Sequence, residues 1–306
     1  MPARRFSPMR ISTHTVNDNI VRQIQLLSSQ QAKLQQQVAT GQRIAQPEDD
    51  PASVGRVLNL ESEQRQLAQF QANASRALEL SQASYSGLRA IKKVSDRATE
   101  IGTLGAGALN PASARAYASE LNQLIEQTVQ LTNSRFGNDY LYAGTAVGAP
   151  PFVATRDAAG QLTSVAYAGD SARAAIPLSE ATHLAPNTDG PTNLGLRNFV
   201  NQLVALRDAL QMNSAAGVTA AQTDLITTED LLVSSIAEHG GVQTRIHATQ
   251  SQLSDRALGL QSLVANETEA DLPSTIVKLN QTQTAYQAAL QSAANVMKIS
   301  LLDYIR

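Results

Sequence analysis

The sequence predicts a mainly α-helical fold: long antiparallel helices, a coiled coil formed by the two chain ends, and a small β-rich domain inserted in the middle. Three observations support this prediction. The 306 residues contain no Trp and only 4% aromatic residues, so the core must be built from Leu, Ile, Val and Ala, which suit packed helices. Apolar residues recur at heptad spacing near both ends. The middle of the chain is instead rich in Gly, Pro and Thr.

The first two helices are expected on either side of a short connection. A heptad stripe begins at Ile20 and stops at Thr40, just before a glycine that suits a helix end. Asp50 and Pro51 then provide an N-cap and a first helical residue for the second helix. That helix extends for about fifty residues, until its stripe weakens among glycines before Asn110.

The third helix and the β-rich domain follow from a change in spacing. Helical spacing over 114–131 predicts a helix that ends near 136–138. Two extended segments, 151–155 and 161–167, flank a turn-rich stretch at 157–160. They predict a β-hairpin.

The last helices are separated by a proline. Helical stripes return over 196–210 and, after a loop near Gly217, over 225–264. Pro273 interrupts the pattern, and a proline inside a helix loses a hydrogen bond at a cost of about 3 kcal/mol. We therefore expect a joint there, followed by a final stripe over 276–301.

The chain ends cannot be stable as isolated helices. Burying the large aliphatic side chains of the N-terminal stripe contributes on the order of 10 kcal/mol, whereas ordering its backbone costs about 1–2 kcal/mol per residue over roughly 25 residues. We expect the two ends to pair and their remaining apolar surface to bind other subunits. The expected assembly interface consists of Ile20, Ile24, Leu27, Leu34, Val38, Ile276, Leu279, Tyr286, Leu290, Met297 and Leu301.

Composition excludes several classes of function. The formal charge of −2 provides no basic field for nucleic acid or anionic lipid. The absence of Cys excludes disulfides, thiolate metal sites and cysteine nucleophiles. No apolar run approaches the ~20 residues that span a bilayer, and no apolar stretch of a cleavable signal follows the N-terminal arginines. We expect neither a nucleic-acid nor a membrane partner.

Two groups of polar residues are candidate reactive sites. His239 and His247 lie two helical turns apart, about 12 Å, too far to bind one metal ion directly, so surface or seam histidines are the favoured interpretation. The acidic run 48–50 suits acid–base chemistry or a cation, but its place before Pro51 favours helix capping. No Ser, His and acid arrangement follows from spacing, so the sequence predicts no enzyme, no catalytic residue, no metal and no cofactor.

Three motifs occur together near the N-terminus: Met9–Thr13, Thr40–Ile44 and Pro47–Pro51. They resemble the N-terminal region of the bacterial flagellin superfamily. The C-terminal ones, Gln283–Leu290 and Ser300–Tyr304, are similar to the terminal helix of the superfamily's member at the hook–filament junction. The segment Tyr140–Thr145 also resembles that member, although Tyr142 stands where Phe is more usual. Residues 1–8 have no counterpart in the family.

The resemblance implies a secreted structural protein of the extracellular flagellum, exported through the flagellar type III apparatus and placed at the hook–filament junction. Its implied partners are the first hook-associated protein, flagellin, copies of itself in a ring and a flagellar export chaperone. Flagellin itself is the alternative, and an unrelated secreted coiled-coil protein is a more distant one. The expected division is an extension at 1–8, a terminal coiled-coil layer at 9–46 plus 272–306, a helical domain at 47–138 plus 196–271 and a β-rich variable domain at 139–195.

Overall fold

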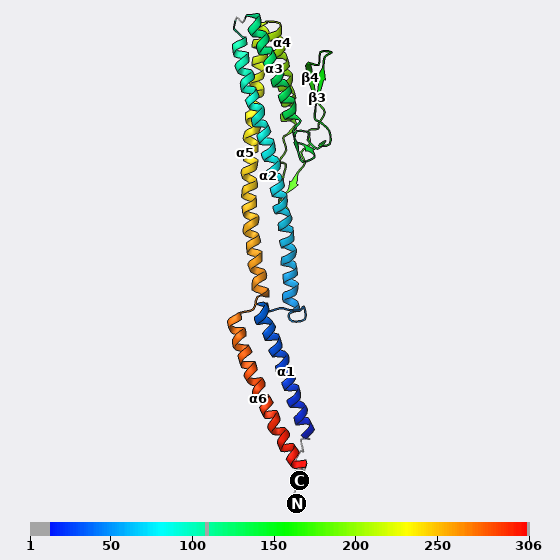
Figure 1. Cartoon of the computed structure of the whole chain (residues 1–306), viewed down its shortest axis with the longest axis vertical. Coiled ribbons are helices and arrows are strands. Elements are labelled where there is room, and N and C mark those ends of the chain that lie inside the picture. Colours follow the sequence, from blue (N-terminus) through cyan, green and yellow to red (C-terminus); the bar gives the residue numbers. More distant parts are fainter. Residues whose placement is uncertain (1–12, 108–109, 305–306) are drawn as a thin grey trace, which may run out of the picture. The chain divides into compact units, whose positions relative to one another are not determined.

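The structure, a computed structural model, describes residues 13–107 and 110–304, with side chains over 18–107 and 110–295. The chain forms two compact units, one containing the chain up to Gln64 and from Leu258 onward, the other Arg65–Ala257. Long antiparallel helices dominate, and the described strands all lie in the middle of the chain (Figure 1). The predicted mainly α fold with a small β-rich insert is thus confirmed. The finer division into terminal, helical and variable domains stays a prediction, and its extension at 1–8 lies outside the described residues.

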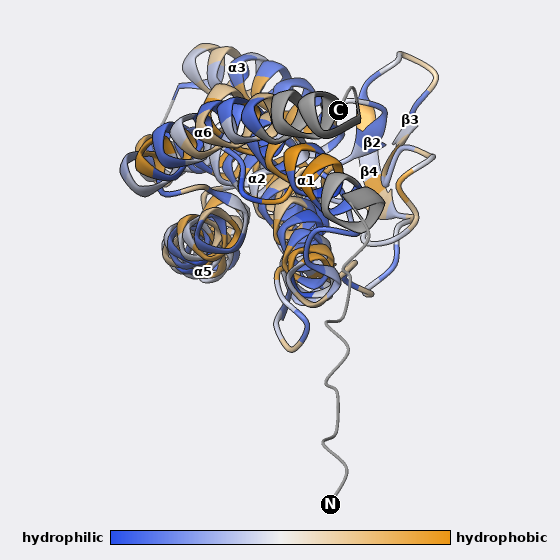
Figure 2. Ribbon diagram, turned by 90° about the horizontal axis from the view of Figure 1, so that it is seen from below, coloured by the Kyte–Doolittle hydropathy of each residue, from blue (hydrophilic) through white to orange (hydrophobic). Residues whose placement is uncertain are grey.

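The first unit is built around a pair of terminal helices. Helix α1, Thr13–Thr40, and helix α6, Leu272–Tyr304, pack against each other along their length in antiparallel directions (Figure 1). The unit also contains the start of α2, Pro51–Gly105, and the end of α5, Ala215–Thr268. Helices α1, α2 and α5 each carry orange apolar and blue polar residues in Figure 2, as amphipathic helices do.

The second unit holds the main hydrophobic core. Helices α2 and α5, of 55 and 54 residues, pass through it beside α3, Pro111–Thr132, and α4, Gly190–Gln211. Their facing apolar side chains are fully buried and include Leu88, Ile91, Leu121, Ile125, Phe199, Leu203 and Leu225. Within the described residues, every helix is too short or too polar to span a lipid bilayer.

Three helix ends differ from the expectation. Helix α3 stops at Thr132, since the chain turns into β1, Arg135–Phe136, which pairs with β2, Asp139–Tyr140. Helix α4 starts earlier than expected because Asp189 caps it, accepting a hydrogen bond from the Thr192 amide at 2.9 Å. Helix α5 begins at Ala215, so the expected loop is shorter and ends before Gly217.

The predicted hairpin is confirmed. Strand β3, Phe152–Arg156, pairs antiparallel with β4, Leu162–Tyr167. In the turn, Asp157 Oδ1 accepts hydrogen bonds from two backbone amides, and Gly160 adopts a φ of 82° that favours glycine. A further short pair, β5 (Ile176–Pro177) and β6 (His183–Leu184), follows the hairpin.

Tyr142 fixes the start of the β-rich region on α2. The side chain is fully buried, and its hydroxyl donates a hydrogen bond to the Ser84 carbonyl at 3.2 Å. The hydroxyl fits because position 87 is glycine: a Cβ on Gly87 would lie 2.2 Å from the Tyr142 Oη. Tyr142 therefore has a matching space on the neighbouring helix.

Candidate assembly interface

Five of the predicted interface residues lie on one face of α1. This face repeats at intervals of four and three residues, the spacing of a coiled-coil seam. Leu34 is its most buried member at 8% exposure, and the others are half-buried. Since α6 packs along α1, we call this contact the α1–α6 seam. On α1 it consists of Ile20, Ile24, Leu27, Gln31, Leu34 and Val38.

The predicted residues of α6 divide into two columns. Leu279 and Tyr286 are half-buried and belong to the column that the α1–α6 seam covers. Ile276 and Leu290, in contrast, are each 44% exposed and lie beside that column. Met297 lies with Leu301 beyond the residues whose side chains are described. The apolar stripe of α6 is therefore wider than the seam with α1.

Sequence reasoning missed two seam residues because they are polar. Thr275 and Thr282 are 6% and 7% exposed and continue the spacing of four and three through Leu279 and Tyr286. Each hydroxyl donates to the carbonyl four residues earlier, so burial leaves no hydroxyl proton without an acceptor. The four-and-three spacing along the helix could have identified both threonines as seam residues. A search for apolar residues alone overlooks them.

The two chain segments that connect the terminal helices to α2 and α5 are hydrogen-bonded to each other. Gly41, with a φ of 71°, ends α1, and its carbonyl accepts a bond from the Ala270 amide at 2.8 Å. The Arg43 amide donates to the Thr268 carbonyl at 2.7 Å, and Gln42 pairs with Glu269 in an isolated antiparallel bridge. These contacts align the end of α1 with the start of α6.

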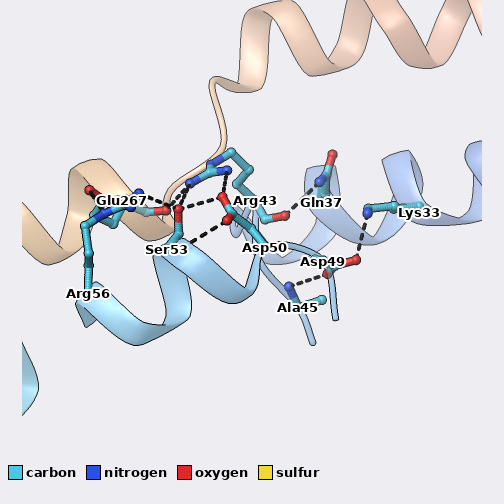
Figure 3. Close-up of polar contacts among 9 residues, drawn as sticks. All are labelled: Lys33, Gln37, Arg43, Ala45, Asp49, Asp50, Ser53, Arg56 and Glu267. Carbon is cyan, nitrogen blue, oxygen red and sulfur yellow. Dashed lines mark hydrogen bonds and ion pairs between the residues drawn. The ribbon is translucent and has the colours of Figure 1, made fainter. Parts of the chain in front are cut away.

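A group of charged and polar side chains lies beside these segments (Figure 3). We call Arg43, Asp50, Ser53, Arg56 and Glu267 the joint cluster. Arg43 bonds Asp50 Oδ2 at 3.1 Å, and Ser53 donates to the same oxygen at 2.6 Å. Arg56 forms a two-pronged ion pair with Glu267, at 3.0 and 2.9 Å. The pKa of Glu267 is lowered, chiefly by the hydrogen bond from Arg56.

Asp50, the last residue of the acidic run 48–50, caps α2 as the sequence predicted, whereas Asp49 bonds α1 and the segment before α2. Asp50 accepts a hydrogen bond from the Ser53 amide at 3.1 Å at the start of α2, and its pKa lies well below the usual range because Ser53 bonds the carboxylate. Asp49 binds Lys33 of α1 at 2.7 Å and the amides of Ala45 and Gln46. These hydrogen bonds, that from Lys33 first, lower the pKa of Asp49 to about 2.

The predicted break before α6 is present, and Pro273 lies just after it. Pro273 is the second residue of α6, a position where a helix needs no backbone donor. The preceding Asp271 carbonyl accepts the Thr275 amide at 2.9 Å, and Ala270 is held by Gly41. The hydrogen-bonded connecting segments thus coincide with the break, and we expect them to maintain it without the proline.

The two histidines are separate, as expected. His239 is buried between α2 and α5, where its Nδ1 lies 3.2 Å from Ser81 Oγ, and burial lowers its pKa. His247 is exposed. Among the described residues, no cluster of three or more His, Cys, Asp or Glu is arranged to hold a metal ion. His239 is therefore the seam histidine that the sequence analysis favoured.

Comparison with known proteins confirms the predicted resemblance. Residues 11–146 match the family model described as the bacterial flagellin N-terminal helical region. The chain is 27% identical to Flagellar hook-associated protein 3 of Salmonella typhimurium over 97% of this chain and all of that protein. The fold is similar to FlgL of Bacillus cereus, with a TM-score of 0.59 and 16% identity over 68% of this chain and 99% of the other. FlgL of Xanthomonas campestris is also similar, with a TM-score of 0.53 and 15% identity over 65% and 97%. The chain therefore resembles members of the bacterial flagellin superfamily along nearly its whole length, and these similarities support a structural component of the flagellum.

Proposed function

We propose that the protein joins the flagellar hook to the flagellin filament, with its terminal helices assembling as coiled coils. Its partners in this role are the first hook-associated protein on one side, flagellin on the other, and copies of itself in a ring. A flagellar export chaperone would accompany it before assembly. The single observation that supports this proposal most is the stripe of α6, which extends beyond its seam with α1.

The uncovered side of the terminal pair is suited to further helix packing. Ile276, Val277 and Leu290 remain 44%, 55% and 44% exposed on α6, and Val21 and Leu26 are exposed on α1. Full burial of one such side chain contributes about 1.5–3 kcal/mol, so covering the exposed half contributes about 1 kcal/mol each. Contacts of this size, repeated between neighbouring subunits, stabilise an assembly without being needed to fold the single chain.

Leu290→Asp tests the proposal. In the free chain the carboxylate stays hydrated, whereas in an assembled seam an unpaired carboxylate costs several kcal/mol. We expect normal export and monomer melting, few attached filaments, and flagellin released into the medium. Gln287→Asp is the matched control on an exposed polar position of the same helix and should leave attachment normal.

A third variant separates folding from assembly. Ala293 is 8% exposed in the α1–α6 seam, so Ala293→Asp should weaken the terminal pair in the free chain as well. Normal filament attachment in the Leu290→Asp strain would refute the proposed interface. A Leu290→Asp monomer that melts like the Ala293→Asp monomer would show instead that Leu290 stabilises the single chain.

The alternative is that the protein is flagellin itself, and the match of residues 11–146 to the flagellin N-terminal region favours it. Location and growth distinguish the two. A junction protein should be labelled by antibody as one band between hook and filament and should not elongate from seeds. Flagellin should be labelled along the filament and should grow long filaments.

A further inference from the structure

We propose that Arg43 is the residue that makes the connecting segments, the end of α5 and the start of α2 fold as one cooperative element. This conformational role concerns the single chain and holds wherever the protein is placed in the flagellum. It begins with the guanidinium, which reaches two helix ends at once (Figure 3). One side donates to Asp50, the N-cap of α2, and the other donates to the Glu267 carbonyl in the last turn of α5 at 2.6 Å.

This geometry satisfies two opposite helix ends with one side chain. The last carbonyls of a helix lack partners within the helix and carry the negative end of its dipole, so a cation that donates a hydrogen bond suits them. The first turn prefers a carboxylate, here Asp50. Arg43 is the cation for α5 and the partner of the carboxylate for α2. The planar fork of Arg can bond both, while the single ammonium of Lys reaches fewer acceptors.

The backbone of Arg43 connects further segments. Its amide donates to Thr268 at 2.7 Å, and its carbonyl accepts a hydrogen bond from the Gln37 side chain of α1 at 2.9 Å. The amide, the carbonyl and two guanidinium nitrogens of Arg43 thus form hydrogen bonds to α1, to α5 and to Asp50 at the start of α2. The neighbouring contact between Gly41 and Ala270 depends on the same alignment.

The rest of the joint cluster provides a comparison within the same site. Arg56 also bonds Glu267 and Ser53, yet its contacts join only α2 and α5 and do not involve the connecting segments. Removing Arg56 therefore deletes an ion pair of similar exposure. Removing Arg43 deletes the contact on which the connecting segments depend.

Hydrogen exchange of the full-length chain, resolved by mass spectrometry, tests the proposal. In the wild type, the amides of Arg43, Ser53 and Ala270 should be protected. Arg43→Gln should accelerate exchange of all three together by about tenfold or more, the effect of losing a hydrogen bond to a charged group. Arg56→Gln should leave Arg43 and Ala270 protected. Amides of 114–132 serve as the internal control for global folding.

Fast exchange at Arg43 and Ala270 in the wild type would overturn the proposal. So would an acceleration by Arg43→Gln that is confined to positions 43 and 53 or that extends across 114–132, and so would equal acceleration at Ala270 in Arg56→Gln and Arg43→Gln. Arg43→Lys tests the role of the fork and guards against a variant that fails to fold. We expect it to protect Ser53 but not Ala270. Full protection of both would show that positive charge alone is sufficient and would refute the two-ended contact.

Discussion

The space opposite Tyr142 allows a sharp test of how the β-rich region is attached to α2. Gly87 lies in the interior of α2, where alanine is favoured over glycine by about 1 kcal/mol. In this chain, however, an added Cβ would lie 2.2 Å from the Tyr142 hydroxyl oxygen. Without that oxygen, the nearest ring atom would be Cζ at 3.4 Å, an ordinary contact distance. Gly87→Ala should therefore lower the stability of the protein when residue 142 is Tyr, and leave it unchanged or raise it when residue 142 is Phe.

The expected magnitudes follow from these distances. Overpacking costs about 1–3 kcal/mol, and a contact this short belongs at the upper end, so Gly87→Ala alone should destabilise by roughly 2 kcal/mol after the gain in helix propensity. Tyr142→Phe alone should cost about 1 kcal/mol for the lost hydrogen bond. In the Phe background, Gly87→Ala should be neutral or stabilise by up to about 1 kcal/mol. The double-mutant cycle should give a coupling of about 2–3 kcal/mol.

Urea unfolding, followed by far-UV circular dichroism, measures this cycle in four proteins. The slopes of the transitions should agree, so that shifts in midpoint report stability. Equal destabilisation by Gly87→Ala in the Tyr and Phe backgrounds would refute the proposed fit between hydroxyl and glycine. Limited proteolysis within 142–170 provides a second readout, because cleavage there should increase when the fit is lost.

Three further predictions concern pH and the helix break. Burial lowers the pKa of His239, so the unfolded chain, with a histidine pKa of about 6.5, binds the proton more readily than the folded chain. The free energy of unfolding should therefore fall as the pH decreases below about 6.5. Thermal melts from pH 8 to 5 should show a falling melting temperature, and His239→Gln should reduce this pH dependence. Asp49 and Asp50 have lowered pKa values, so the stability that their ionised carboxylates contribute is complete above about pH 4 and is lost as pH falls toward 2. The amides of Ala45 and Ser53 should lose exchange protection in that pH range. In Asp49→Asn the Ala45 amide should already be poorly protected at neutral pH and should change little on acidification. Pro273→Ala should leave the break before α6 in place, with unchanged helicity and rapid exchange of the Asp271 and Leu272 amides, although from sequence alone alanine should permit one continuous helix. New exchange protection of the Asp271 and Leu272 amides would contradict this expectation.

The elements were predictable where local chemistry determines them. Asp50 before Pro51 identified the start of α2, and the turn beginning at Asp157 separated the two strands of the hairpin. The end of α3 was predicted too late because the pairing of Arg135 with Tyr140 ends the helix, and periodicity carries no information about such pairing. Local signals therefore predicted the start of α2 and the hairpin turn, but they missed the starts of α4 and α5 as well as the end of α3.

The joint cluster was not predictable in the same way. Arg43 appeared only as a member of a family motif, and its contact with the Glu267 carbonyl joins residues 224 positions apart. Spacing along the chain cannot indicate which carbonyl at a distant helix end lacks a partner. The available local signal was the cap at Asp50, which indicated a helix start but not the cation that would bind it.

The stripe of α6 shows what periodicity leaves open about function. Apolar spacing of four and three residues predicts that a helix packs against something, and it does not distinguish a partner within the chain from one in another subunit. The structure separates these cases: Leu279 and Tyr286 are covered in the single chain, while Ile276 and Leu290 remain 44% exposed. Ile276 and Leu290 lie two heptads apart, with Gln283 at the heptad position between them. We expect assembly to depend on these two exposed side chains, so substitutions there should affect attachment of the filament before they affect folding.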